Sequence, residues 1–238
     1  MNPLIFSTAT FAGIPRYAVK LLATIEGQIT WVELQRVYHQ TLRLQQNGAL
    51  RTGLRLCDSS RSFDEVCLRW AQLAILTQTV VIADSSIQSS ESFSKMKDTF
   101  ILRETLIPYI FSTLSVEGMT LPLARSLLVE SPKEEPLDST DVFIVQQYML
   151  GPSILVSPIL KPNSDPHQIY FPLFRNNNNS TTPLYSFYDG ARVSENSQGK
   201  TVEINVTSLP PMFIKGGSIM VLRKNASLEI TIALDIQG

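Results

Sequence analysis

The 238-residue chain has little charge and no surplus of either sign. Charged residues make up 17% of it, and the formal net charge is −1. Without a basic surplus, we expect no electrostatic footprint for nucleic acid or for anionic lipid. The longest apolar candidate, Ala71 to Ala83, is interrupted by polar residues and is shorter than the roughly 20 residues that cross a bilayer. The first residues show neither a basic segment nor a cleavage pattern, so they do not predict a secretory signal. These absences exclude a nucleic-acid partner and a membrane span from our expectations.

Groups that commonly carry catalysis are also scarce. The chain has two histidines, His39 and His167, far apart in the sequence and without companions at metal-ligand spacing. We interpret the first as a structural or solvated helix residue and the second as a structural or solvated loop residue. Lys215–Ser218 lacks the frame of a phosphate-binding loop and predicts a turn. No Ser-His-Asp arrangement stands out. We therefore expect no metal and no cofactor.

Cysteine is nearly absent, but its spacing and the Asn-x-Ser/Thr sequons are informative. From the residues alone, Cys57 and Cys67 are either two buried thiols or a short-loop disulfide. Several sequons together with a disulfide favour an extracytoplasmic history. The asparagine tract around two of the sequons predicts a solvated loop tip. The sequons begin at Asn178, Asn179, Asn205 and Asn225.

Apolar residues make up 44% of the chain, and their pattern differs between the first two-thirds and the rest. In the first two-thirds, apolar residues recur at helical spacing between short strand-like runs, which favours parallel βα units. A serine-rich stretch, Ser85 to Ser94, predicts a loop, and Asp98 is a candidate N-cap for the helix that follows. The predicted helices are Ile29–Leu50, Phe63–Leu76 and Asp98–Gly118, and Gly53–Cys57 is a predicted strand.

After about Ser131 the pattern changes to short β-type runs separated by Pro, Gly and Asn. This spacing predicts an antiparallel sheet or sandwich. The expected division is residues 1–150 and residues 151–238. The expected strand runs are Phe143–Val145, Ile154–Val156, Ile169–Phe171, Tyr185–Tyr188, Val202–Val206, Met212–Ile214, Ser218–Leu222 and Leu228–Leu234.

Several short motifs, taken in order, resemble glycoside hydrolase family 31, the α-glucosidases and α-xylosidases. Individually each motif is weak, but their common order covers nearly the whole chain. They are Thr10–Gly13 with Arg16–Ala18, Cys57 with Cys67–Trp70, Arg103–Phe111, Gln147–Pro162, Tyr170–Pro172, Leu184–Gly190 and Pro211–Ile219.

The resemblance implies an α/β part followed by an all-β part. The first is the late βα units of a (β/α)8 TIM barrel, and the second is an incomplete antiparallel β-sandwich. It also implies that Cys57 and Cys67 form a disulfide, as in secreted and lysosomal members. The expected compartment is the secretory pathway, lysosomal or extracellular. Because Met1 aligns with the entry to a late barrel strand, we expect the chain to be a truncated product.

A retaining glycosidase needs two carboxylates about 5–5.5 Å apart. The family places its nucleophile in a Trp-hydrophobic-Asp-Met-Asn-Glu strand, which this sequence lacks and which would align before Met1. The family's acid/base position falls on Thr24 when counted from Arg16 and on Glu26 when counted from Trp31. Glu26 is thus the candidate acid/base residue, with a solvated loop glutamate as the alternative.

Other positions that contact sugar in the family carry different chemistry here. Thr8 replaces an arginine, Gly53–Arg55 replaces Gly-Ala-Asp, and Val81–Ala83 replaces Arg-Asn-His. The resemblance therefore implies a family that hydrolyses α-glucosides, and the substitutions predict an inactive chain. The alternative is a non-catalytic carbohydrate-binding or scaffold protein, using aromatics such as Tyr185, Phe187 and Tyr188 unless these are core. Expected partners are an α-glucoside or oligosaccharide, the missing barrel portion or an active homologue.

Overall fold

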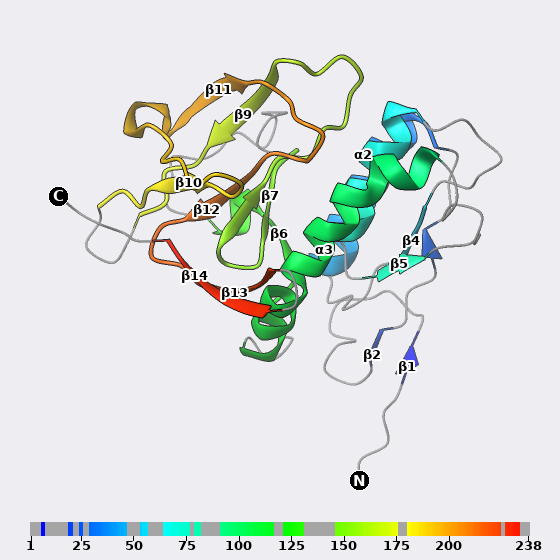
Figure 1. Cartoon of the computed structure of the whole chain (residues 1–238), viewed down its shortest axis with the longest axis horizontal. Helices are drawn as coiled ribbons and strands as arrows, with labels where there is room; N and C mark the ends of the chain where they lie inside the picture. Colours follow the sequence, from blue (N-terminus) through cyan, green and yellow to red (C-terminus); the bar gives the residue numbers. More distant parts are fainter. Residues whose placement is uncertain are drawn as a thin grey trace, which may run out of the picture. The chain divides into compact units, whose positions relative to one another are not determined.

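The computed structural model consists of two units, each described by itself below (Figure 1). Unit 1 comprises Met1–Thr105, Leu114–Ala124 and Leu160–Pro162, and unit 2 comprises Leu106–Thr113, Arg125–Ile159 and Asn163–Gly238. The boundary expected at residues 150 and 151 stays a prediction. The structure describes residues 6–7, 19–20, 24–25, 29–46, 53–56, 64–76, 79–81, 91–116, 121–130, 146–175, 180–224 and 227–233.

Short parallel strands and helices alternate in unit 1, as the sequence predicts. One sheet has the order β3-β4-β5 and is parallel throughout, and β1 pairs with β2 in parallel. The strands are β1 (Phe6–Ser7), β2 (Val19–Lys20), β3 (Thr24–Ile25), β4 (Gly53–Arg55) and β5 (Thr79–Val81); the helices are α1 (Trp31–Gln46), α2 (Glu65–Leu76) and α3 (Glu91–Val116), of which α3 enters both units.

Capping residues explain where α1 and α2 begin. The Glu33 N–H donates to Thr30 Oγ1 at 3.2 Å, and the Cys67 N–H donates to Asp64 Oδ1 at 3.1 Å. Each side chain satisfies a backbone donor that the first helical turn leaves without a partner. At the other end of α2, Arg103 NH1 donates to the Ile75 carbonyl at 2.6 Å. Both predicted helices are confirmed, with slightly narrower bounds.

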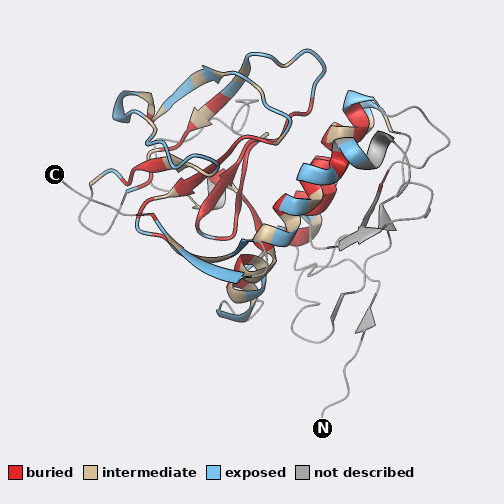
Figure 2. Ribbon diagram, in the orientation of Figure 1, coloured by how far each residue is buried: buried red, intermediate tan, exposed pale blue. Residues whose placement is uncertain are grey.

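The buried faces of α1 and α2 form the core of unit 1. Residues of α1 are buried at helical spacing, and α2 is buried along most of its length (Figure 2). Gln45 is only 1% exposed, and its Oε1 accepts the Ala124 N–H at 2.8 Å. A buried amide therefore ties α1 to a chain segment 79 residues later. The largest fully buried side chains here are Trp70, Tyr38, Leu34, Ile75 and Leu76.

The predicted start of α3 is wrong. The helix begins at Glu91, inside the serine-rich stretch expected to be a loop, and Asp98 lies within it rather than at its cap. Met96 and Thr99 are each 1% exposed and extend the buried stripe of α3 upstream. Burial of this stripe outweighs the weak helix propensity of serine.

Unit 2 consists largely of antiparallel sheets, which confirms the all-β expectation for this part. Its main sheet has the order β10-β12-β8-β7-β6, and two further pairs are β11-β9 and β13-β14. The strands are β6 (Ala124–Ser126), β7 (Tyr148–Leu150), β8 (Ile154–Val156), β9 (His167–Phe171), β10 (Leu184–Ser186), β11 (Lys200–Ile204), β12 (Met212–Lys215), β13 (Ile219–Lys224) and β14 (Ser227–Ile232); α4 (Leu127–Glu130) and the 3-10 helix η3 (Glu195–Ser197) complete the described elements.

Most of the predicted strand runs overlap these strands, but their bounds differ by a few residues: Val202–Val206 extends past the end of β11, and β6 and β7 were not predicted. Phe143–Val145 lies outside the described residues, and Phe187 and Tyr188 belong to the turn after β10 rather than to a strand. The core is a cluster of aliphatic and aromatic side chains from the sheets, from α4 and from the segment that follows β9. Its members are Leu127, Met149, Leu155, Ile169, Phe171, Phe174, Leu184 and Phe213.

A buried tyrosine fastens the β7–β8 turn to α3 within unit 2. Tyr109 Oη donates to the Leu150 carbonyl at 2.8 Å and accepts the Ser153 N–H at 3.2 Å. Gly151, between them, has a φ of +60°, and a Cβ there would overlap Tyr109 Oη. Burial raises the pKa of Tyr109, so its phenol stays protonated and able to donate. Tyr109 and Gly151, which belong to motifs far apart in the sequence, thus pack directly against each other.

Candidate functional site

The carboxyl ends of β3, β4 and β5 meet at one edge of the parallel sheet in unit 1. The register pairs Ile25 with Leu54 and Leu54 with Val80, and it places Arg55 opposite Val81. Glu26 follows β3 directly in the sequence but lies outside the described residues. In parallel α/β sheets and barrels, this edge is where catalytic and binding residues gather.

The sheet brings together two of the three stretches that the sequence analysis singled out as altered sugar contacts. Gly53–Arg55 forms β4, and Val81 ends the neighbouring β5. Thr8, the third, follows Ser7 of β1 and lies outside the described residues. The only ionisable residue within the three strands of the sheet is a cation, Arg55. These strand segments therefore contribute no carboxylate to the edge.

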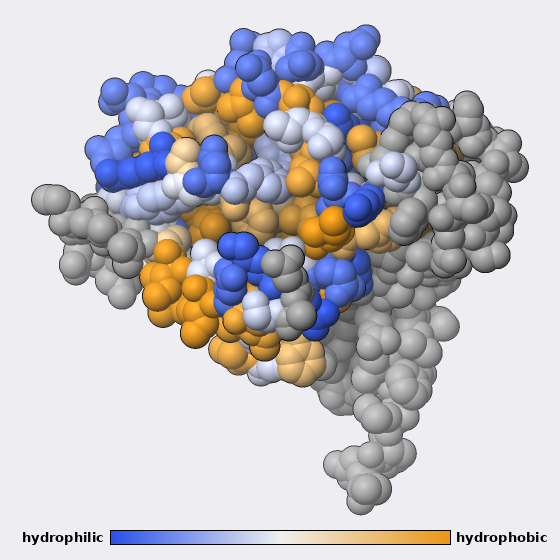
Figure 3. Space-filling model, in the orientation of Figure 1, coloured by the Kyte–Doolittle hydropathy of each residue, from blue (hydrophilic) through white to orange (hydrophobic). Residues whose placement is uncertain are grey.

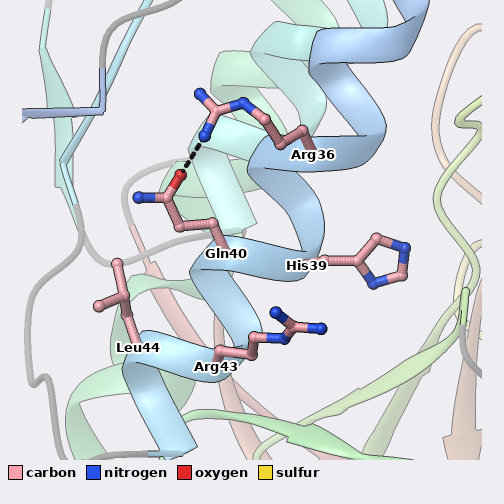
Figure 4. A pocket seen from close by; sticks show the side chains of 5 residues that line it. All are labelled: Arg36, His39, Gln40, Arg43 and Leu44. Carbon is pink, nitrogen blue, oxygen red and sulfur yellow. Dashed lines mark hydrogen bonds between the residues drawn. The ribbon is translucent and has the colours of Figure 1, made fainter.

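A separate pocket of about 500 Å³ lies along one side of α1 (Figure 4). Arg36 NH1 donates to Gln40 Oε1 at 2.8 Å, and its guanidinium also pairs with Glu33. Burial, with a smaller contribution from Arg43, lowers the pKa of His39, so its imidazole is neutral at neutral pH. The lining residues are Arg36, His39, Gln40, Arg43 and Leu44, and none of them offers a carboxylate for glycosidic chemistry.

Sequence analysis missed a serine–histidine pair in unit 2. Ser157 Oγ lies 3.0 Å from His167 Nε2, and His167 begins strand β9 rather than lying in a loop as predicted. Ser157 is 2% exposed, so a substrate carbonyl cannot reach its hydroxyl. The pair joins the end of β8 to the start of β9. No spacing rule in the sequence predicts the contact between Ser157 and His167, because that contact depends on the path of the loop between β8 and β9.

Metal chemistry has no support in the described part of the chain. No group of three or more His, Cys, Asp or Glu side chains there could hold an ion. Within the same residues, none of the helices combines the length and the apolar character needed to cross a membrane.

Two models of one enzyme family match the chain in succession. The TIM-barrel domain of glycosyl hydrolases family 31 matches residues 1–113, and the family's C-terminal domain matches residues 120–220. The chain belongs to glycosyl hydrolase family 31. The parallel βα units of unit 1 and the antiparallel sheets of unit 2 are what these two domains imply.

Individual relatives agree with this family 31 assignment. A probable alpha-glucosidase of Oryza sativa is 26% identical over 236 residues, covering 94% of this chain and 25% of the relative. Lysosomal alpha-glucosidase of Rattus norvegicus is 29% identical over 183 residues, covering 72% of this chain and 18% of the relative. The chain thus spans about a quarter or less of the length of these curated relatives.

Solved structures of family 31 enzymes share the fold. The Flavobacterium johnsoniae dextranase, in a complex with glucose, superposes with a TM-score of 0.73 at 16% sequence identity. The match covers 99% of this chain and 31% of the dextranase chain. A xylosidase from Aspergillus niger gives a TM-score of 0.63 at 20% identity, covering 83% of this chain and 32% of the xylosidase chain.

The remaining predicted site residues of this family 31 chain divide between described and undescribed positions. Cys67 is disulfide-bonded, whereas Cys57, the chain's other cysteine, lies outside the described residues, so their pairing stays a prediction. Asn205 is exposed just after β11. The other three sequons begin outside the described residues, at Asn178, Asn179 and Asn225.

The aromatic residues of β10 and of the turn after it are neither fully buried nor fully exposed. Tyr185 and Phe187 are half-buried, and Tyr188 is 43% exposed. The Tyr188 hydroxyl donates to the Pro210 carbonyl at 2.6 Å, and its ring meets Phe187 edge-on with centroids 5.5 Å apart. Asp189, in the same turn, accepts the Ala191 N–H. An exposed aromatic ring beside a carboxylate is an arrangement that can contact a sugar.

Proposed function

We propose that this chain is a catalytically incompetent portion of an α-glucosidase-type family 31 protein. The observation that carries the proposal is the edge formed by β3, β4 and β5, where Arg55 pairs with Val81 in the register and no residue of the three strands is acidic. A retaining glycosidase must hold a nucleophile and an acid/base carboxylate about 5–5.5 Å apart. Glu26, one residue past β3, could fill one of these two roles but not both.

The test is hydrolysis of a chromogenic α-glucoside by the purified full chain. The expected result is product release no faster than in a protein-free blank. Turnover that disappears in Glu26→Gln, and persists in Glu33→Gln, would overturn the proposal. Glu33 is the matched control because its carboxylate is occupied by Arg36 on α1.

A second function, sugar binding without hydrolysis, is favoured by the turn after β10. The half-exposed ring of Tyr188 and the neighbouring Asp189 offer an apolar face and an acceptor, the two features with which proteins bind sugars. Calorimetric titration with maltose should give heat that Asp189→Asn reduces. Absence of heat at millimolar maltose rejects this second function. A scaffold role, in which the chain associates with an active homologue, is tested by co-purification with a full-length family 31 enzyme.

The proposed compartment is the secretory pathway. Supporting observations are the disulfide at Cys67, the exposed Asn205 and the presence of lysosomal enzymes among the relatives. Expression behind a secretory leader should yield protein whose mass falls after enzymatic deglycosylation. In Asn205→Gln the fall should be smaller by one glycan. An unchanged mass in the starting protein contradicts the proposal for Asn205.

A further inference from the structure

The β13–β14 ribbon of unit 2 has one strongly apolar face. In the antiparallel register, alternate residues point to opposite sides of the ribbon. One side therefore carries three cross-strand pairs, of which two are wholly aliphatic. The pairs are Ile219 with Ile232, Val221 with Ile230, and Arg223 with Leu228.

This apolar face is exposed to solvent. Ile219 is 70% exposed, Ile230 69%, Leu228 64% and Ile232 56%. The opposite side of the ribbon carries Met220, which is 1% exposed. The ribbon thus packs through the Met220 side and presents its aliphatic side outward. Figure 3 shows the result as a hydrophobic patch at the lower left, over the position of β13 and β14.

The patch is comparable in size with the largest apolar patch that a typical monomer exposes, and such patches are often functional. Its four most exposed residues together present roughly 500 Å², within the range of about 300–600 Å² for the largest patch on monomeric proteins. The hydrophobic effect therefore favours covering it.

We propose that the aliphatic face of the β13–β14 ribbon binds a second copy of this chain, face to face about a two-fold axis. In such an isologous contact each copy offers the same surface to the other. The Val221–Ile230 pair lies at the centre of the face, so an axis there stacks aliphatic groups on aliphatic groups. The spacing between packed sheets, about 10 Å, suits interdigitating side chains of this size.

Charge selects the antiparallel orientation of the two ribbons. Arg223 lies at one end of the face, and in the antiparallel arrangement it meets the partner's Ile219–Ile232 end. Arg223 of one copy then lies about 14 Å along the strand from Arg223 of the other, because four strand residues span that length. At this distance, repulsion between the two guanidinium groups is largely screened. Lys224 and Glu229 are on the opposite side of the ribbon and pair with each other at 3.6 Å.

The area matches what a modest dimer requires. Covering the patch on both copies buries roughly 1,000 Å², which is close to the lower limit for specific protein interfaces. No charged group lies at the centre of the face, so pairing with a second copy leaves no central charge without a partner. We therefore expect a reversible dimer whose population rises with concentration.

Sedimentation velocity of the full chain over about a hundredfold range of concentration tests this dimer. The native chain should shift from monomer towards dimer, and Ile230→Lys should raise the dissociation constant at least about tenfold. Val32→Lys is the matched control, because Val32 is 79% exposed on α1, outside the ribbon, and should leave association unchanged. Circular dichroism of each variant checks that the fold persists.

Cross-linking provides a second, positional readout. Ile230→Cys near the axis should give a disulfide-linked dimer on mild oxidation, whereas Val32→Cys should not. A native chain that stays monomeric throughout the concentration range overturns the proposal. Association that Ile230→Lys leaves unchanged also overturns it, since the contact would then lie on another surface, as it would if the partner were a different protein.

Discussion

The turn between β7 and β8 and the carboxyl edge of β3, β4 and β5 differ in what their residues do. At the turn, Tyr109 and Gly151 fit each other so closely that neither can change without disturbing the other. At the edge, the resemblance aligns two positions that the family uses for sugar with Arg55 and Val81, which pair in the register and offer no carboxylate. The comparison teaches that residues can serve the fold of an enzyme family without serving its reaction.

Gly151→Ala should give the largest effect. The added Cβ overlaps Tyr109 Oη, and alanine is strained at a φ of +60°. We expect a loss of about 3 kcal/mol or more in the free energy of unfolding of unit 2, measured by urea denaturation. Gly190→Ala is the control: its φ is +71°, but nothing lies within 4 Å of a Cβ there. It should cost only about 1–2 kcal/mol, and equal losses would refute close packing at Gly151.

Tyr109→Phe should cost about 2 kcal/mol, since the Leu150 carbonyl and the Ser153 N–H both lose a buried partner. The same urea titration measures it. Because the hydroxyl is the atom closest to an added Cβ, Gly151→Ala should be less harmful in the Tyr109→Phe background. Strict additivity of the two changes would show that Tyr109 Oη does not restrict Gly151.

Glu33→Gln should have a small effect that depends on pH. Hydrogen bonding from Arg36 lowers the pKa of Glu33. A carboxyl whose pKa is lower in the folded chain stabilises the fold above its unfolded pKa of about 4.3, and this contribution disappears as the pH falls through the folded value. For this surface pair we expect a few tenths of a kcal/mol. Thermal melts of both proteins should differ at neutral pH and converge in acid, once Glu33 is protonated in the folded chain. A difference that stays constant as the pH falls would contradict the assignment.

Arg55→Asp should have no effect on activity. It restores a carboxylate at the end of β4, but one carboxylate there does not complete the pair that hydrolysis needs. Release of chromophore from an α-glucoside should therefore stay at the blank level. Any turnover gained by this single change would show that the edge retains more of the family's chemistry than its residues indicate.

Local signals in the sequence predicted much of the secondary structure. Apolar residues at helical spacing predicted α1 and α2, and the change to short β-type runs near residue 131 corresponds to the antiparallel sheets of unit 2. The start of α3 could not be predicted in this way, because burial of Met96 outweighs the local preference of its serines. The pairing of Ser157 with His167 had no local signal either.

The sequence by itself determined the family 31 resemblance and the order of the two folds, because both depend on residue identity and spacing along the chain. The substitutions at the sugar-binding positions stay a prediction from that resemblance. Only the tertiary structure decided that Tyr109 holds the turn around Gly151, that Arg55 pairs with Val81 in the strand register and that the β13–β14 ribbon exposes one aliphatic side. Those facts depend on strand register and on contacts between distant segments, which local patterns do not encode.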